Sequence, residues 1–177
     1  MTTCNDSNDN SIVIDFSLFP FCFRTTSIGK YTNHLKDDNQ FHEFFQRLIE
    51  KDIPAISQFT FDTVTRETQK HSHVISTRDK QYQLVISILK EIFKSYYNSE
   101  NLEKDFELFL ENNINDYAIW QLGISGGIRL IGIKKVNRFY VLFIDYHHLI
   151  YPDKNYNQPN YQMYNYCPMI NNRKGGN

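Results

Sequence analysis

The sequence predicts an α+β fold in which an N-terminal strand and two or three helices precede an antiparallel meander of three or four strands and a coil tail. Two patterns support this prediction. Apolar residues recur at helical spacing in stretches between residues 41 and 110, and from residue 117 to 151 they form short β-rich runs separated by turn residues. We expect any chemistry to lie in this C-terminal meander.

The composition is that of a globular domain with an aromatic-rich core. The chain has 177 residues, of which 41% are hydrophobic and 15% aromatic, which is enough for one well-buried core and short for two. We therefore predict a flexible tail over 1–10, a single domain over 11–152 and a tail or arm rich in Asn and Tyr over 153–177.

Cysteine use and charge indicate the compartment. The three cysteines lack CxxC spacing, and an odd number cannot all pair, which favours a reducing environment. The start MTTCNDSNDN lacks a secretory pattern, and no apolar run approaches the ~20 residues that span a bilayer. We expect a cytoplasmic protein with no membrane partner. Because the net charge is -1, any nucleic-acid binding must come from a local patch.

The first part of the chain predicts a strand, a loop and a helix. Residues 11–16 (SIVIDF) predict the strand, and the polar stretch 24–39 predicts a long loop. Asn39 is the candidate N-cap of the helix, and Pro54 predicts that it ends near Asp52. The helical stripe consists of Phe41, Phe44, Phe45, Leu48 and Ile49.

The middle of the chain predicts one extended segment and two helices. Residues 55–76 alternate aromatic and β-branched residues, as in FTFDT, which favours a strand or an extended loop. A helix is predicted over 77–98 from its single apolar face. Ser99 is placed to cap a further helix that stops at Asn112 and Asn113.

The meander contains one run that is apolar on both alternating faces. This run, FYVLFI at 139–144, predicts a central strand covered on each side. After Pro152 the sequence has neither helical nor strand period. We predict a coil that either lies on the domain through its tyrosines or serves as a partner-binding arm.

Common cofactor and metal motifs are missing from the sequence. No phosphate-binding glycine loop is present, and GISGG at 123–127 precedes a strand pattern where a hydrolase nucleophile needs a helix. His71, His73 and His147 could supply metal ligands to a hydrolase, but no ligand spacing motif connects them. Ordinary hydrogen-bonding histidines are favoured, and we expect neither a metal nor another cofactor.

Cations, imidazoles and a phenol gather around the meander. Arg129 lies in a predicted strand, and the others lie at the hairpin or where the last strand ends. RNA cleavage needs a base for the 2′-hydroxyl, cations for the phosphate and an acid for the leaving oxygen. The alternative is a solvated hairpin tip and a strand with a Pro stop. The full set is Arg129, Lys134, Lys135, Arg138, His147, His148 and Tyr151.

The meander resembles the C-terminal part of RelE-like toxins, the mRNA endoribonucleases of toxin-antitoxin systems. The likeness rests on Trp120, Leu122, Gly127, Arg129, Gly132, Phe139, Asp145, His148 and Tyr151. The resemblance implies a metal-independent endoribonuclease that acts through 2′-hydroxyl attack, binds RNA or the ribosome, and is held by an antitoxin-like inhibitor.

The resemblance also implies individual roles. Arg129 would contact the scissile phosphate, His148 would transfer protons and Tyr151 would accompany it. RNA-binding positions would be Lys134, Lys135, Arg138 and His147. In a regular strand residues three apart face opposite sides, so His148 and Tyr151 require a bend, whereas His147 and Tyr151 share a face. The sequence leaves the choice of histidine open.

A non-enzymatic protein is the alternative to an enzyme. The near-neutral charge, small size and Tyr-rich tail also fit a phage or mobile-element protein that binds and inhibits a host defence or nucleic-acid enzyme. Its partner would then be a host protein rather than RNA.

Overall fold

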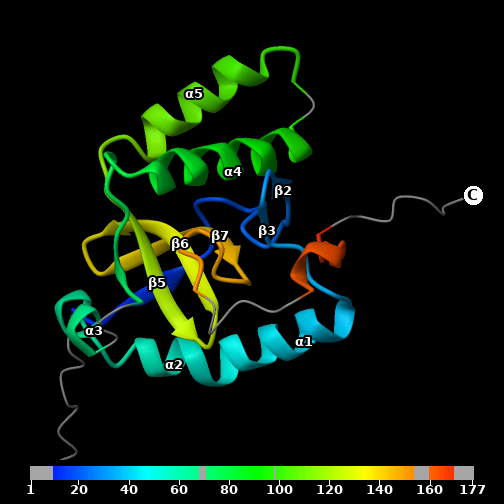
Figure 1. Cartoon of the computed structure of the whole chain (residues 1–177). Coiled ribbons are helices and arrows are strands. Elements are labelled where there is room, and N and C mark those ends of the chain that lie inside the picture. The colour runs from blue at the N-terminus through cyan, green and yellow to red at the C-terminus, as the bar shows by residue number, and fades with distance from the viewer. Residues whose placement is uncertain (1–9, 68–70, 98, 154–159, 170–177) are drawn as a thin grey trace, which may run out of the picture.

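A five-stranded mixed sheet lies between two layers of helices in the computed structural model, which describes residues 10–67, 71–97, 99–153 and 160–169 (Figure 1). The strand order is β1-β7-β6-β5-β4. The strands are β1 Val13–Asp15, β4 His73–Val74, β5 Ile119–Ser125, β6 Ile128–Lys135 and β7 Arg138–Asp145. The predicted α+β class is confirmed.

The antiparallel meander is formed by β5, β6 and β7. Gly123 on β5 pairs with Arg129 on β6, and Arg129 pairs with Asp145 on β7. β7 is flanked by β1 and β6, and residues 141–145 are fully buried because helices cover both faces, as predicted for 139–144. The last β-rich run of the sequence, 146–151, forms a turn rather than a strand.

The predicted N-terminal strand is confirmed as β1, and it lies parallel to β7. Val13 pairs with Arg138 and Asp15 with Tyr140. At the opposite edge, His73 of β4 pairs with Gln121. The sheet is therefore extended on both sides of the meander by short strands from the first half of the chain.

Each face of the sheet has its own apolar core. Helices α4 (Lys80–Tyr96) and α5 (Leu102–Asn113) cover one face, above the sheet in Figure 1, and confirm the two helices predicted there. Helices α1 (Asp38–Arg47), α2 (Ile53–Ile56) and α3 (Phe61–Glu67) contribute to the core on the other face.

Two details of the first helical segment differ from the prediction. The N-cap of α1 is Asp37 rather than Asn39, since the Asp37 carboxylate accepts a hydrogen bond from the Gln40 backbone at 2.9 Å. The helix also does not end near Asp52. A π-helical turn, η1 (Leu48–Asp52), continues into α2, and Pro54 lies in the first turn of α2. The wider turn shifts the backbone bonding that a proline would otherwise disrupt.

The strand or extended loop predicted over 55–76 is wrong for most of its length. Residues 61–67 form α3, because Phe61 and Val64 are buried at helical spacing. Thr60 and Thr63 cap its start reciprocally, with each backbone N–H donating to the other hydroxyl at 2.8 and 3.3 Å. Among the described residues of this stretch, only β4 forms a strand.

The long loop predicted over 24–39 contains a small hairpin of β2 (Ser27–Ile28) and β3 (Tyr31–Thr32). The described part of the predicted tail lies against this region. A 3-10 turn, η2 (Tyr161–Met163), leads to Tyr166, which forms an antiparallel bridge with Leu35. The remaining tail residues and the predicted flexible segment before Asn10 lie outside the described residues. In the described ranges, no helix has the length and apolar character needed to cross a membrane.

Candidate functional site

A row of polar residues lies on the α4 side of the sheet, at the end of the apolar core. Arg129 and Asp145 face each other across β6 and β7, and they are 1% and 0% exposed. Two ionisable groups at this depth require stabilising contacts from their surroundings. Those contacts define the candidate site.

Gly123 leaves room for His71 above the sheet. A Cβ built on Gly123 would lie 2.5 Å from the His71 Cβ, so no other residue fits there without displacing the histidine. In this position His71 Nδ1 lies 3.1 Å from Arg129 Nη2. A guanidinium only donates, so Nδ1 accepts and the neutral imidazole carries its proton on Nε2.

The other terminal nitrogen of the Arg129 guanidinium is held by the backbone. Nη1 donates to the carbonyls of Gly126 at 2.8 Å and of Ile128 at 2.9 Å. The guanidinium is thus fixed beneath the imidazoles, where burial strengthens its effect on their protonation.

His148 lies next to His71 because the chain bends sharply after β7. His148 has a φ of 57°, in the left-handed region, and its ring centroid is 6.5 Å from that of His71. Burial lowers the pKa of His148 to about 4, and the charge of Arg129 adds to this effect. His148 is therefore neutral at pH 7.

His73 and Tyr151 form a second pair in the same corner, with ring centroids 4.9 Å apart. Burial lowers the pKa of His73, and the charge of Arg129 lowers it further. Burial also raises the pKa of Tyr151, and the nearby Asp79 carboxylate contributes. At neutral pH the imidazole is thus without its extra proton and the phenol retains its own.

Asp145 shapes the turn that carries His148. Its carboxylate accepts hydrogen bonds from the backbone of His147 at 3.3 Å and of Ile150 at 3.0 Å. Burial raises the pKa of Asp145 to about 6, against the opposing effect of these bonds and of Arg129. The cost of burying the charge therefore outweighs the stabilisation that these hydrogen bonds and Arg129 give to the ionised carboxylate.

His147 points away from this corner. Its Nε2 donates to the His34 carbonyl at 2.7 Å, and its ring packs against Tyr161 and Tyr164 of the tail. The structure thus brings His148 and Tyr151 to the same corner as Arg129 through a bend, and places His147 against the tail. We refer to His71, His73, His148, Arg129 and Tyr151 as the histidine corner.

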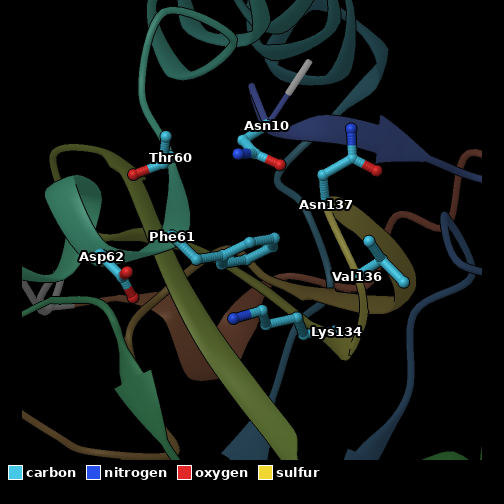
Figure 2. Close-up of a pocket in the computed structure, with 7 residues that line it drawn as sticks. All are labelled: Asn10, Thr60, Phe61, Asp62, Lys134, Val136 and Asn137. Carbon is cyan, nitrogen blue, oxygen red and sulfur yellow. The ribbon is translucent and has the colours of Figure 1, made fainter. Parts of the chain in front are cut away.

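The other predicted cations lie at the opposite end of β6 and β7. Lys134 is five residues from Arg129 along β6, which corresponds to roughly 17 Å. Its Nζ lies 4.6 Å from the Phe61 ring centre, and the two residues line an open cavity of about 330 Å³ (Figure 2). Lys135 lies over Tyr117, and Arg138 pairs with Asp15 at 3.1 Å. These cations do not join the histidine corner.

Comparison with known proteins links the chain to one family. Residues 17–174 match the family model described as uncharacterised protein UU032. The chain belongs to this family. It is 26% identical over 165 residues to "Uncharacterized protein UU032" of Ureaplasma parvum serovar 3 (strain ATCC 700970), covering 93% of this chain and 85% of the relative. No solved structure matches the chain significantly.

The metal-ligand trio considered from the sequence is not brought together in this member of the UU032 family. His71 and His73 lie in the histidine corner, whereas His147 contacts His34 and the tail. Across the described part of the chain, no group of three His, Cys, Asp or Glu side chains is arranged to hold a metal ion.

His71 and His73 are the members of the site that motif reasoning did not connect to Arg129. Their position depends on the pairing of β4 with β5, which joins segments about 50 residues apart. One signal was available: a glycine inside a strand indicates close approach of another group, and Gly123 is such a glycine.

Proposed function

We propose that this protein is a metal-independent endoribonuclease that cleaves RNA by attack of the 2′-hydroxyl, as the resemblance of its meander to RelE-like toxins implies. The observation that supports this most is one corner in which imidazoles and a phenol lie side by side, at ring-centroid distances of 6.5 and 4.9 Å, with pKa values shifted in opposite directions. The pKa values of His148 and His73 are lowered and that of Tyr151 is raised. Groups whose environments separate their pKa values are suited to act as base and acid.

In this proposal His148 is the general base. Its neutral imidazole takes the proton of the 2′-hydroxyl as the oxygen attacks the adjacent phosphorus. His73, the second imidazole held neutral, lies beside Tyr151 and is the more accessible of the two, so it orients the substrate or shares this role.

Tyr151 and His71 act on the other side of the reaction. Tyr151, which stays protonated at neutral pH, donates its proton to the leaving 5′-oxygen as the P–O5′ bond breaks. His71 donates a hydrogen bond from Nε2 to a phosphate oxygen, because Arg129 occupies its Nδ1. The products are a 2′,3′-cyclic phosphate and a 5′-hydroxyl.

Arg129 contributes mainly by position and charge. Its bonds to Gly126, Ile128 and His71 hold the guanidinium under the reacting groups. The buried charge favours a phosphate above it and opposes protonation of the imidazoles. The family resemblance implies a more direct role, in which Arg129 contacts the scissile phosphate itself.

The proposal extends to the setting of a toxin. A ribonuclease of this kind would act in the cytoplasm on mRNA, alone or on the ribosome, and an antitoxin-like protein would restrain it. Lys134, Lys135 and Arg138 would then contact RNA remote from the cleaved bond, since they lie at the other end of the sheet.

One observation favours the second candidate, a non-enzymatic inhibitor of a host enzyme. Helix α1 and the π turn present Phe45 and Ile49, which are 40% and 48% exposed, and Phe45 packs on Phe41 and Phe23. An exposed apolar strip of this kind is typical of protein interaction sites. If this face carries the function, Phe45→Asp abolishes it while variants of the histidine corner do not.

Incubation of the purified protein with labelled RNA, in EDTA without ribosomes and in Mg²⁺ buffer with ribosomes, tests the nuclease proposal. We expect fragments that end in 2′,3′-cyclic phosphate, and a reduction of about 10²- to 10⁴-fold in His148→Ala. His42→Ala, which alters an exposed histidine on α1, is the matched control. Expression should arrest growth, and Arg129→Ala should relieve the arrest. Intact RNA under all conditions, with harmless expression, would exclude the enzyme.

A further inference from the structure

Two open cavities with shared lining residues lie beside the histidine corner. The first has a volume of about 300 Å³ and the second about 510 Å³, and both are lined by Leu84, Leu149 and Pro152. Each volume falls in the range of about 300 to 1,000 Å³ that is usual for sites that bind small molecules. We refer to these two adjoining cavities, whose lining comes from the N-terminal half of α4, the β2-β3 hairpin and residues 149–152, as the trough.

The trough begins where the histidine corner ends. Leu149, which lines both cavities, directly follows His148, and Pro152 directly follows Tyr151. At the same end, Lys80 follows Asp79, whose carboxylate acts on the pKa values of His73 and Tyr151. A polymer whose cleaved bond lies at the histidine corner would therefore reach the trough with the next one or two of its units.

The lining combines cations with apolar and aromatic surface. Lys80 lies at the near end and Lys30 at the far end, and both are exposed. Tyr161 also lines the far cavity, and its ring stacks on that of His147 at an interplanar angle of 25°. The near end lies along Leu84 and Ile150.

The residues that line the two cavities include no Asp or Glu. By contrast, the lining of the cavity at the β6-β7 hairpin includes Asp62, and that of the cavity along η1 includes Glu43, Glu50 and Asp52. With Asp79 beside its near end but no carboxylate in its lining, a groove with lysines and an aromatic side chain matches the surfaces that hold single-stranded nucleic acid.

We infer that this trough binds the single-stranded RNA next to the cleaved bond, with Lys80 and Lys30 contacting its phosphates and Tyr161 stacking on a base. The inference rests on the proposed ribonuclease function and names its substrate as unpaired RNA. It also gives the Tyr-rich tail a role, because Tyr161 is supplied by the tail.

Fluorescence anisotropy with a labelled eight-nucleotide oligonucleotide tests the trough without cleavage. Methylated 2′-hydroxyls keep the probe intact, and an RNA duplex serves as the competitor. We expect the double variant Lys30→Ala/Lys80→Ala to weaken binding about tenfold. The slope of log K against log salt should fall by about 1.4 for two lost phosphate contacts. Tyr161→Ala should weaken binding about fivefold or more. The control Lys51→Ala removes an exposed lysine of the π turn and should bind as wild type.

Each outcome separates the trough from the nuclease. If the double variant binds the probe as tightly as wild type, or if no protein binds it, the trough is wrong, and cleavage by wild type would still support the ribonuclease. If binding depends on Lys30, Lys80 and Tyr161 but no RNA is ever cut, the trough stands and the catalytic proposal fails. Equal competition by the duplex would overturn the preference for unpaired RNA.

Discussion

The two ends of the β6-β7 ladder carry the same kinds of side chain in opposite settings. At one end Arg129 is 1% exposed, bound to two carbonyls and to His71. At the other end Arg138 has a side chain that is 52% exposed and pairs with Asp15. A charge acts strongly on its neighbours only where water is excluded, so depth, rather than residue type, separates a candidate site from an ordinary surface.

Replacing each arginine by methionine should give the largest difference between the two ends. Arg129→Met breaks the bonds to the backbone and leaves Asp145 buried opposite an apolar side chain, which should cost about 3–5 kcal/mol of unfolding free energy. Arg138→Met should cost about 1 kcal/mol or less, because its ion pair is largely exposed.

Urea unfolding at pH 8, where Asp145 is ionised, measures both values. Arg129→Lys serves as the control, since it keeps the charge and loses the forked donors. Equal losses in the two methionine variants would show that the buried arginine is no more important to the fold than the exposed one.

Filling the space under His71 should have the next largest effect. Gly123→Ala places a Cβ 2.5 Å from the Cβ of His71, so we expect a loss of about 1–3 kcal/mol and a displaced imidazole. Gly126→Ala is the control, because its Cβ would meet nothing within 4 Å and only its φ of 53° is strained. Thermal unfolding compares the two, and RNA cleavage should fall more in Gly123→Ala. A larger loss of cleavage in Gly126→Ala than in Gly123→Ala would place His71 outside the site.

The histidine end should also show a compensated dependence on pH. The pKa of His148 falls from 6.5 to about 4 on folding, so its contribution is lost as pH falls through that window. The pKa of Asp145 rises from 3.8 to about 6 on folding, so its contribution to the free energy of unfolding is lost as pH rises from about 4 to 6. The two slopes oppose each other between about pH 4 and 6.

Replacing His148 or Asp145 should reveal the pH dependence of stability that the other residue causes. His148→Gln should gain stability relative to wild type when the pH falls from 7 to 5, and Asp145→Asn should lose it. Urea unfolding at the two pH values measures this difference. Identical pH profiles in both variants would contradict the assigned pKa directions.

The smallest effects are expected at the hairpin end. Lys134→Ala and Lys135→Ala each remove a contact with an aromatic ring, at Phe61 and Tyr117, worth about 0.5–1 kcal/mol. Since these lysines lie far from the histidine corner, RNA cleavage should change less than about threefold. A larger loss of cleavage than in the Lys30 and Lys80 variants would move the RNA path to the hairpin.

The comparison also explains which features could be predicted from the sequence. The meander was predictable because alternation with turn residues is a local pattern, and 139–144 is apolar on both faces. Helix α3 was missed because FTFDT alternates while Phe61 and Val64 also share a helical face, and burial favoured the second pattern. Local periodicity could not choose between them.

The site was predictable only in part for a related reason. Arg129, His148 and Tyr151 were named from the meander, but their partners His71 and His73 come from β4 and the residues before it. The choice between His147 and His148 depended on a bend at φ 57° that a residue other than glycine rarely adopts. A long-range pairing and one backbone angle therefore decide which histidines lie in the corner with Arg129.

The parallel pairing of β1 with β7 has a consequence for synthesis on the ribosome. Val13 can pair with Arg138 only after Arg138 has left the exit tunnel, and the bridge between Leu35 and Tyr166 can form only after Tyr166 has done so. Contacts between such distant positions form late, because a long loop must be closed first. The growing chain thus exposes an unpaired β1 for most of its translation, and a protein that captured this segment during synthesis would prevent completion of the sheet before the histidine corner was enclosed.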